Sequence, residues 1–439
     1  MDPAYAATAA IWLLGFLLYR LLFPSNGPVQ GSVVAWGFGV FVVFFGLLEQ
    51  GGLMLRPWIM ISLWALTCLS LGWLVKRQGK IIADVSHSPR ETLPWWLWVQ
   101  GVLVCGFHAL VATAAGLSGP PGMGIYGYRA KLWWLLGRTP EGFYASPGYD
   151  FCNPDHPPGW SLVTLWHSAW QGCWEDHWVK LWVPICLFLS WRVTVGWMRR
   201  RGMPWWCLAA PAAFMLCDPA IIWSRWYYGE ALLLLLVLTG LLSLFEGDRK
   251  GISRGVNHPV AGLALLACAA WIKNEGLIYW IIGACMCLWM WPHAWRYVAM
   301  TLPLATGWRV LMILHGAHTL DFDWHGAFTR PAAESWTRLG EMAEMARTVC
   351  FMSWRNHFGL WWLLPLIVLA ALIKRGRLSR LLLIACVVSA LLLWAVYYFS
   401  ALPMKQHAFA FRRVLTIPAW LLLMAICSAF SAQSTSDVT

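Results

Sequence analysis

Charged side chains are scarce in this sequence. Lys, Arg, Asp and Glu make up 12% of its 439 residues, and 59% of the residues are hydrophobic, whereas soluble domains carry about 25% charged residues. The mean hydropathy is +0.58. This composition excludes an ordinary water-soluble domain and indicates a protein whose main solvent is the lipid bilayer.

Motifs of the common soluble enzymes are missing as well. No Walker loop, GxSxG elbow or dinucleotide-binding fingerprint occurs in a strand-to-helix context. The 13 cysteines show no CxxC spacing, so we interpret them as small apolar side chains and not as zinc ligands or a disulfide framework. The sequence therefore predicts no cofactor.

One group of residues has a spacing compatible with a divalent metal but follows no strict ligand pattern such as HExxH. A solvated loop is the favoured interpretation, and no metal site is predicted. The group consists of His315, His318, Asp321, Asp323 and His325.

Long apolar runs are abundant in this chain. A helix needs about 17 to 25 apolar residues to cross the ~30 Å hydrocarbon layer. The runs predict an all-α fold, a polytopic transmembrane helical bundle of about 11–13 spans. Residues 158–170 are too short to span and rich in tryptophan, so we expect an interfacial helix lying on the membrane. The spans are expected near residues 5–23, 33–49, 54–75, 95–117, 178–197, 204–222, 229–245, 259–273, 277–292, 298–314, 356–373, 381–399 and 413–430.

The distribution of the runs also predicts an organisation along the chain. We expect N-terminal transmembrane helices in residues 1–117 and a membrane core in residues 118–430, followed by a polar tail in residues 431–439. Two long segments, 118–177 and 315–355, carry acidic residues and are expected to form loops on the outer face.

The net charge of +12 does not indicate a nucleic-acid partner, because the basic residues lie in short clusters between apolar runs. The positive-inside rule places such clusters on the cytoplasmic side. We therefore expect a multi-pass protein of the cytoplasmic (inner) membrane with the lipid bilayer as its partner. The clusters are Lys76, Arg77 and Lys80; Arg199, Arg200 and Arg201; Arg249, Lys250 and Arg254; and Lys374, Arg375, Arg377 and Arg380.

Ionisable groups at membrane depth need a reason to be there, because each costs about 2.5 kcal/mol or more at a helix centre. Glu230, Lys273 and Glu275 are such groups. They could sit at span ends and neutralise one another. Other polar residues of the outer face converge on the same side, however: Asp150, Asp155, His156, Arg225, Tyr228, Arg412 and Arg413. An acid in this set could act as a general base while arginine or lysine binds a phosphate leaving group.

Several motifs, taken in order, resemble a known family. They are Arg129-Ala130-Lys131, then Pro154-Asp155-His156-Pro157-Pro158, Tyr228-Gly229-Glu230, Trp271-Ile272-Lys273-Asn274-Glu275-Gly276 and finally Arg413-Val414-Leu415 before Pro418. Residues 118–430 are thereby similar to the bacterial GT-C superfamily of polytopic membrane glycosyltransferases, related to the dolichyl-phosphate-mannose protein mannosyltransferase and aminoarabinose transferase group.

The resemblance implies a GT-C-like catalytic core that uses a polyprenyl-phosphate sugar donor and a glycan, lipid or protein acceptor. It also implies an acid in the first outer loop as the catalytic base, and inversion at the sugar carbon. The sequence departs from the family at Ser118-Gly119-Pro120-Pro121-Gly122, where an Asp is expected.

Asp155, or else Asp150, is therefore the predicted base, and Glu230 stands where the family more often has Asp. The expected substrate-binding residues are Arg129, Lys131, His156, Arg225, Tyr228, Lys273, Glu275, Arg412 and Arg413. Two alternatives remain: a transporter or flippase, and a non-catalytic subunit for a lipid-linked saccharide. No internal repeat supports the transporter, and nearly every charge lies at a span end or in an outer loop.

Overall fold

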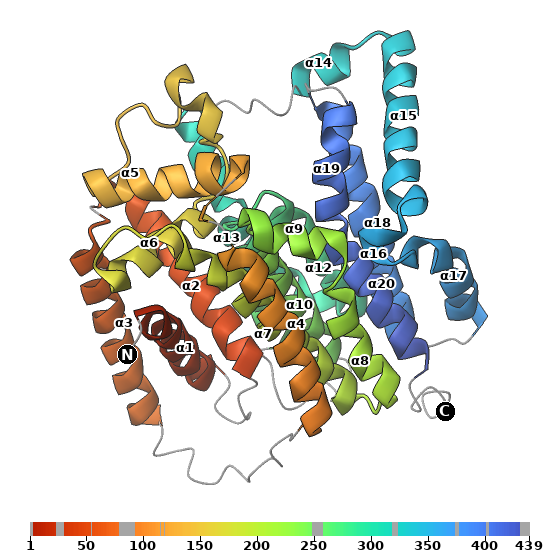
Figure 1. The fold of residues 1–439 in the computed structure, drawn as a ribbon, viewed down its shortest axis with the longest axis horizontal. Helices are drawn as coiled ribbons and strands as arrows, with labels where there is room; N and C mark the ends of the chain where they lie inside the picture. The colour runs from red at the N-terminus through yellow and green to blue at the C-terminus, as the bar shows by residue number, and fades with distance from the viewer. Residues whose placement is uncertain are drawn as a thin grey trace. The chain divides into compact units, whose positions relative to one another are not determined.

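The computed structural model of the chain is helical, and no β-strand occurs among the residues it describes (Figure 1). Backbone amides and carbonyls inside a bilayer find no water, so an apolar segment satisfies them best within its own helix. The predicted all-α class is confirmed. The described residues are 3–22, 30–53, 55–78, 93–114, 116–117, 119–247, 258–317, 324–373, 377–400 and 404–430.

The chain forms two compact units, and neither is continuous in sequence. The first contains residues 1–94, 108–193 and 224–317, and the second contains residues 95–107, 194–223 and 318–439. Three helices contribute residues to both units: α4 (Trp95–Thr113), α7 (Trp182–Arg200) and α9 (Asp218–Trp226).

The other elements belong to one unit each. Those of the first unit are α1 (Pro3–Leu22), α2 (Gln30–Gln50), α3 (Pro57–Gln78), η2 (Pro120–Gly127), α5 (Tyr128–Leu136), η3 (Pro147–Cys152), α6 (Gly159–Gln171), η4 (Trp178–Leu181), α10 (Glu230–Gly247), α11 (His258–Ala269), α12 (Glu275–Met290), η5 (Pro292–Ala294) and α13 (Trp295–Leu314). Those of the second are α8 (Trp205–Phe214), α14 (Trp324–Thr329), α15 (Ala332–Arg347), η6 (Thr348–Met352), α16 (Trp354–His357), η7 (Leu360–Leu363), α17 (Leu364–Ile373), α18 (Arg377–Val396), η8 (Tyr397–Phe399), α19 (Met404–Val414) and α20 (Thr416–Ala429).

Each unit contains a long apolar helix that is buried along nearly its whole length. In the first unit α10 packs against α2, α11 and α12, and in the second α20 packs against α8, α17 and α18. Both helices are apolar on all sides, which is typical of a helix with no solvent-facing side. These two helices lie in the cores of their units.

Seven helical segments of the described chain are long and apolar enough to cross a membrane, and an eighth results if the bent pair α8 and α9 counts as one span. Four further apolar helices are shorter. Several candidate spans expose large apolar side chains, such as Leu69 on α3 and Ile313 on α13, which are 71% and 77% exposed. Apolar surface of this kind suits lipid contact, and the helices indicate a multi-pass membrane protein. The seven segments are Ser32–Gln50, Pro57–Arg77, Trp95–Thr113, Trp178–Arg200, Pro292–Leu314, Leu378–Phe399 and His407–Ala429.

The helix expected at residues 158–170 is present as α6, but its predicted position on the membrane surface is wrong. Every residue from Gly159 to Ala169 is buried, because α6 is packed by α1, α2, α3 and α5. An interfacial helix keeps a polar face in water, whereas α6 presents tryptophan and aliphatic side chains to protein on all sides. The helix is part of the core of the first unit.

Some sequence predictions fall outside the described residues. These are the polar tail 431–439, Lys80, the basic cluster at 249–254, and Lys374 with Arg375. Of the remaining basic clusters, Lys76 and Arg77 lie in the last turn of α3. Arg199 and Arg200 lie in the last turn of α7, where a cation also interacts favourably with the helix dipole.

Candidate functional site

Three segments of the first unit meet at the proline-rich loop before α6. The backbone N–H of Gly159 donates to the carbonyl of Trp271 at 2.9 Å, which joins the loop to the end of α11. The indole Nε1 of Trp308, on α13, donates to the carbonyl of Asp155, also at 2.9 Å. These two bonds bring the Asp155 loop and the Lys273 turn, more than one hundred residues apart in sequence, into one place.

Glu230, Lys273 and Glu275 form a buried charge cluster beside this junction. Lys273 Nζ lies 2.9 Å from Glu230 Oε1 and 3.3 Å from Glu275 Oε1. Glu230 is 1% exposed and Lys273 5%. Both acids open helices, α10 and α12, where the positive end of the helix dipole favours a carboxylate. The expected neutralisation of Lys273 by Glu275 is present, but Glu230 is the nearer and more deeply buried partner.

Asp155 forms an ion pair that the sequence analysis missed. Its Oδ2 lies 3.7 Å from Nη1 of Arg309, and the Asp155 side chain keeps 11% of its surface exposed. A lone arginine inside the apolar run 298–314 was the signal that could have found Arg309, because such residues within spans are usually functional. Asp150, on η3, makes no ion pair among the described residues. The predicted role of either acid as a base stays a prediction.

Arg129 holds the backbone of the proline-rich loop by hydrogen bonds. The side chain is 1% exposed. Its Nη1 donates to the carbonyl of His156 at 2.7 Å, and its Nη2 donates to the carbonyls of Pro154 at 2.6 Å and Asn153 at 3.4 Å. Carbonyls satisfy the donors of a guanidinium without cancelling its charge. Arg129 therefore fixes the loop backbone and places a positive charge next to it. Its predicted contact with substrate stays a prediction.

His156 lies in the same loop, among several charged side chains. Its ring is partly exposed, but the Nδ1 atom is buried without a hydrogen-bond partner. The pKa of His156 is lowered from 6.5 to about 3, first by burial and then by the charges of Lys273, Arg129 and Arg309. Glu230 acts in the opposite direction. The three cations and Glu230 thus act on this loop with opposite signs.

The lowered pKa of His156 predicts a pH dependence of stability. Between pH 6.5 and pH 3 the unfolded chain binds a proton that the folded chain does not, so stability falls as the pH drops through this range, by at most about 1.4 kcal/mol per pH unit. Denaturant titrations of the purified protein at a series of pH values measure this slope. His156→Gln is expected to remove this contribution, and an unchanged slope in the variant would contradict it.

A second buried carboxylate lies close to the first site. Glu49, at the end of α2, is 4% exposed and accepts hydrogen bonds from the hydroxyl of Tyr144 at 2.8 Å, from Thr139 and from Gln50. The pKa of Tyr144 is raised well above 10, first by burial and then by Glu49, so the phenol remains a donor. The ring of Tyr144 lies 6.1 Å from that of Trp308. Glu49 was hidden from sequence analysis because it ends an ordinary apolar run.

Three further predicted residues belong to the first unit: Lys131, Arg225 and Tyr228. Lys131 is exposed and lies over the ring of Trp174 at 5.8 Å. Arg225 is exposed, and its carbonyl accepts a 2.8 Å hydrogen bond from the buried Lys180. Tyr228 is buried in the turn before α10. Their roles in binding stay predictions.

Arg412 and Arg413 belong to the second unit. Both lie in the last turn of α19, and their guanidinium carbons lie 4.8 and 5.4 Å from the ring centre of Phe409. Their predicted part in donor binding also stays a prediction.

No group of three or more His, Cys, Asp or Glu side chains suited to a metal ion occurs in the described part of the chain. In the histidine-rich segment, His318, Asp321 and Asp323 lie outside the described residues. His315 packs its ring 5.1 Å from that of Tyr144.

The geometry of the first unit thus brings together the carboxylates of Asp155, Glu230 and Glu275, of which Asp155 and Glu275 are partly exposed, and the cations Lys273 and Arg309. Comparisons of the chain with protein-family models, with curated proteins and with solved structures give no match.

Proposed function

We propose that this protein is a glycosyltransferase of the cytoplasmic membrane that moves a sugar from a polyprenyl-phosphate donor to a glycan, lipid or protein acceptor on the outer face. The observation that carries the proposal is the ion pair of Asp155 with Arg309, in a loop that a backbone hydrogen bond joins to the turn of Lys273. A carboxylate beside fixed cations is the combination that transfer from a lipid phosphate needs.

In the proposed reaction Asp155 accepts the proton of an acceptor hydroxyl as its oxygen attacks the anomeric carbon of the donor sugar. The bond between that carbon and the phosphate oxygen breaks, and its electron pair stays on the released polyprenyl phosphate. Arg309 and Lys273 stabilise the negative charge that develops on the phosphate, because charge-assisted hydrogen bonds strengthen as the charge grows. Attack opposite to the leaving phosphate inverts the anomeric carbon.

The two cations Lys273 and Arg309 differ in their ion-pair partners and in their exposure. Lys273 is already bound to two glutamates, whereas Arg309 has a side chain that is 33% exposed and faces its acid at 3.7 Å. This distance is longer than a tight charge-assisted hydrogen bond. Arg309 is therefore the better placed of the two to exchange its contact with Asp155 for a contact with a phosphate.

Turnover in purified protein tests the proposal. Protein in lipid is incubated with labelled polyprenyl-phosphate sugars and candidate acceptors, and released polyprenyl phosphate is measured. Asp155→Asn is expected to lower turnover by at least about 100-fold, the usual contribution of a general base. Glu141→Gln is the matched control, because Glu141 is an exposed acid of the same segment 118–177 that forms no ion pair among the described residues, and its turnover is expected to stay within about twofold of wild type.

Two outcomes would contradict the proposal. Full turnover in Asp155→Asn would remove the assigned base. A wild-type protein that binds the donor but releases no carrier with any acceptor would favour the non-catalytic or transport alternative, for which the missing acid near Gly122 would then be the reason.

A further inference from the structure

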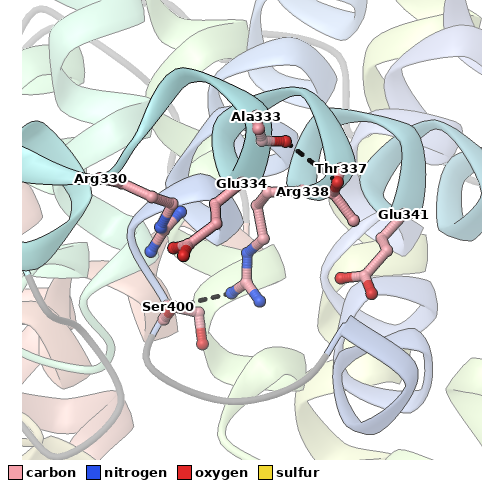
Figure 2. A pocket seen from close by; sticks show the side chains of 7 residues that line it. All are labelled: Arg330, Ala333, Glu334, Thr337, Arg338, Glu341 and Ser400. Carbon is pink, nitrogen blue, oxygen red and sulfur yellow. Dashed lines mark hydrogen bonds between the residues drawn. The ribbon is translucent and has the colours of Figure 1, made fainter.

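A second polar site lies in the second unit, in a pocket of about 450 Å³. Helix α15 and the turn before it form one wall, and the segment around η8 closes the other side (Figure 2). A pocket of this volume accommodates a small ligand. Its lining is Arg330, Ala333, Glu334, Thr337, Arg338, Glu341 and Ser400.

The charged side chains of α15 reach the pocket because they share one face of the helix. Glu334, Arg338 and Glu341 follow one another at spacings of four and three residues, which places them in a row along the helix. Met342 and Met345, the buried residues of the helix, continue this row toward its C-terminal end. Helix α15 packs against α19, so the row is open to the pocket in its first turns and packed against protein further on.

Two arginines are held in the pocket by carbonyl groups. Arg338 Nη2 donates to the carbonyls of Ser400 at 2.7 Å and Tyr397 at 3.3 Å. Arg330 Nη1 donates to the carbonyl of Tyr398 at 3.3 Å, and the guanidinium lies 5.3 Å from the ring centre of that tyrosine. Ser400 is itself fixed by a hydrogen bond between its hydroxyl and His407 on α19. The guanidinium groups are therefore ordered in advance, and these carbonyl contacts leave their charges in place.

The two positive charges act on each other. The pKa of Arg338 is lowered, first by burial and then by the charge of Arg330, while the charge of Glu341 acts in the opposite direction. An anion that contacts both guanidinium groups would reduce the repulsion between them. Because a guanidinium presents paired N–H donors in a plane, a carboxylate or phosphate fits it best.

Two acidic side chains, Glu334 and Glu341, also line the pocket. The carboxylates of Glu334 and Glu341 are exposed and form no ion pair among the described residues, and they lie on either side of the Arg338 guanidinium (Figure 2). Seven residues of α-helix separate the two glutamates by about 10 Å. Carboxylates accept hydrogen bonds from hydroxyl groups, so a ligand that spans both must offer hydroxyls over that length and an anion between them.

We infer that this pocket binds an acidic saccharide, in which a carboxylate or phosphate on a sugar contacts Arg330 and Arg338 while sugar hydroxyls donate to Glu334 and Glu341. Two linked sugar rings cover about the length between the glutamates. A small zwitterion offers a single cationic group and matches only one of them. The inference concerns binding alone and does not depend on the proposed transfer reaction.

Calorimetric titration of the full-length protein in lipid nanodiscs tests the inference. The probes are a tetrasaccharide that contains glucuronate, the same tetrasaccharide with its carboxylates reduced to alcohols, and inorganic phosphate. The acidic form is expected to bind about tenfold more tightly than the reduced form, because loss of a charge-assisted hydrogen bond weakens binding by about that factor or more. Phosphate alone is expected to bind more weakly than the acidic tetrasaccharide.

Variants locate the binding. Arg330→Gln and Glu341→Gln are each expected to weaken binding of the acidic tetrasaccharide about tenfold. Arg347→Gln is the matched control: it removes an exposed cation of the same helix that pairs with Glu344 outside the pocket lining, and its affinity should match wild type. Unfolding temperatures of all variants are compared with wild type, and Arg338 is left intact because it holds the pocket wall.

Three results would overturn the inference. The first is equal affinity for the acidic and the reduced tetrasaccharide. The second is unchanged binding in folded Arg330→Gln and Glu341→Gln. The third is phosphate that binds as tightly as the acidic tetrasaccharide and is unaffected by Glu341→Gln, which would make the pocket an anion site without saccharide recognition.

Discussion

Replacing Lys273 by methionine is expected to lower the free energy of unfolding by about 3–5 kcal/mol, the usual result of removing one partner of a buried ion pair. The variant would leave Glu230 buried with 1% exposure and without the ammonium that lies 2.9 Å away in the native protein. Methionine has nearly the length of lysine and fills the space, so the loss measures the uncompensated charge. Chemical denaturation in mixed micelles gives the value.

The double variant Lys273→Met with Glu230→Gln separates charge from packing. Once Glu230 no longer carries a charge, much of the lost stability should return. Lys131→Met is the matched control, because Lys131 is exposed in the same unit and should change stability by no more than about 0.5 kcal/mol. Equal losses in the Lys273 and Lys131 single variants would contradict a structural role for the buried pair.

Replacing Gly159 by valine is expected to destabilise the protein by about 3 kcal/mol or more, at the upper end of overpacking effects. A Cβ atom at this position would meet the carbonyl oxygen of Trp271 at 2.5 Å and side-chain carbons of Ile272 and Val42 at 2.7 Å. The nearest of these is a backbone atom and cannot rotate away. The same contact carries the hydrogen bond that joins the Asp155 loop to the Lys273 turn.

A valine at Gly72 provides the comparison. Gly72 lies within α3, and a Cβ atom there would have no neighbour within 4 Å. This exchange should be neutral or slightly stabilising, because valine has a higher helix propensity than glycine. If Gly159→Val proves as stable as Gly72→Val, the close approach of the two motif loops is not required by the fold.

The Lys273→Met and Gly159→Val variants test different features of the site in the first unit. Lys273→Met keeps the backbone junction and removes a charge, whereas Gly159→Val keeps every charge and separates the backbones. If the proposed transfer is correct, Gly159→Val should also reduce turnover, because Asp155 must be held close to Arg309 and Lys273 for proton transfer and phosphate stabilisation to occur together.

The described structure explains why the sequence motifs lie where they do. The loop around Asp155 and the turn around Lys273 both stand at helix ends, where polar side chains can leave the apolar layer. Arg129 belongs to a third motif, and its guanidinium N–H groups donate to backbone carbonyls of the Asp155 loop. Three motifs that are short and separate in sequence thus form one polar site in the first unit.

The sequence alone determined the class of the protein and the identity of most charged residues in the first site. Low charge and long apolar runs favour helices long enough to cross a bilayer, because a helix satisfies its own backbone hydrogen bonds where water is absent. The cost of burying a charge in such runs singled out Glu230, Lys273 and Glu275 before any contact was known. Local composition carries this information, so it can be read along the chain.

Only the tertiary structure decided which of these residues meet. In an apolar chain, side chains that face lipid and side chains that face protein have the same composition, so hydropathy cannot tell a buried helix such as α6 from one on the membrane surface. Glu49 and Arg309 are each a single charge in an apolar run, and only the structure showed their partners, Tyr144 and Asp155. The pairing of Asp155 with Arg309 joins residues far apart in sequence, and such a contact follows from how helices pack and not from local pattern.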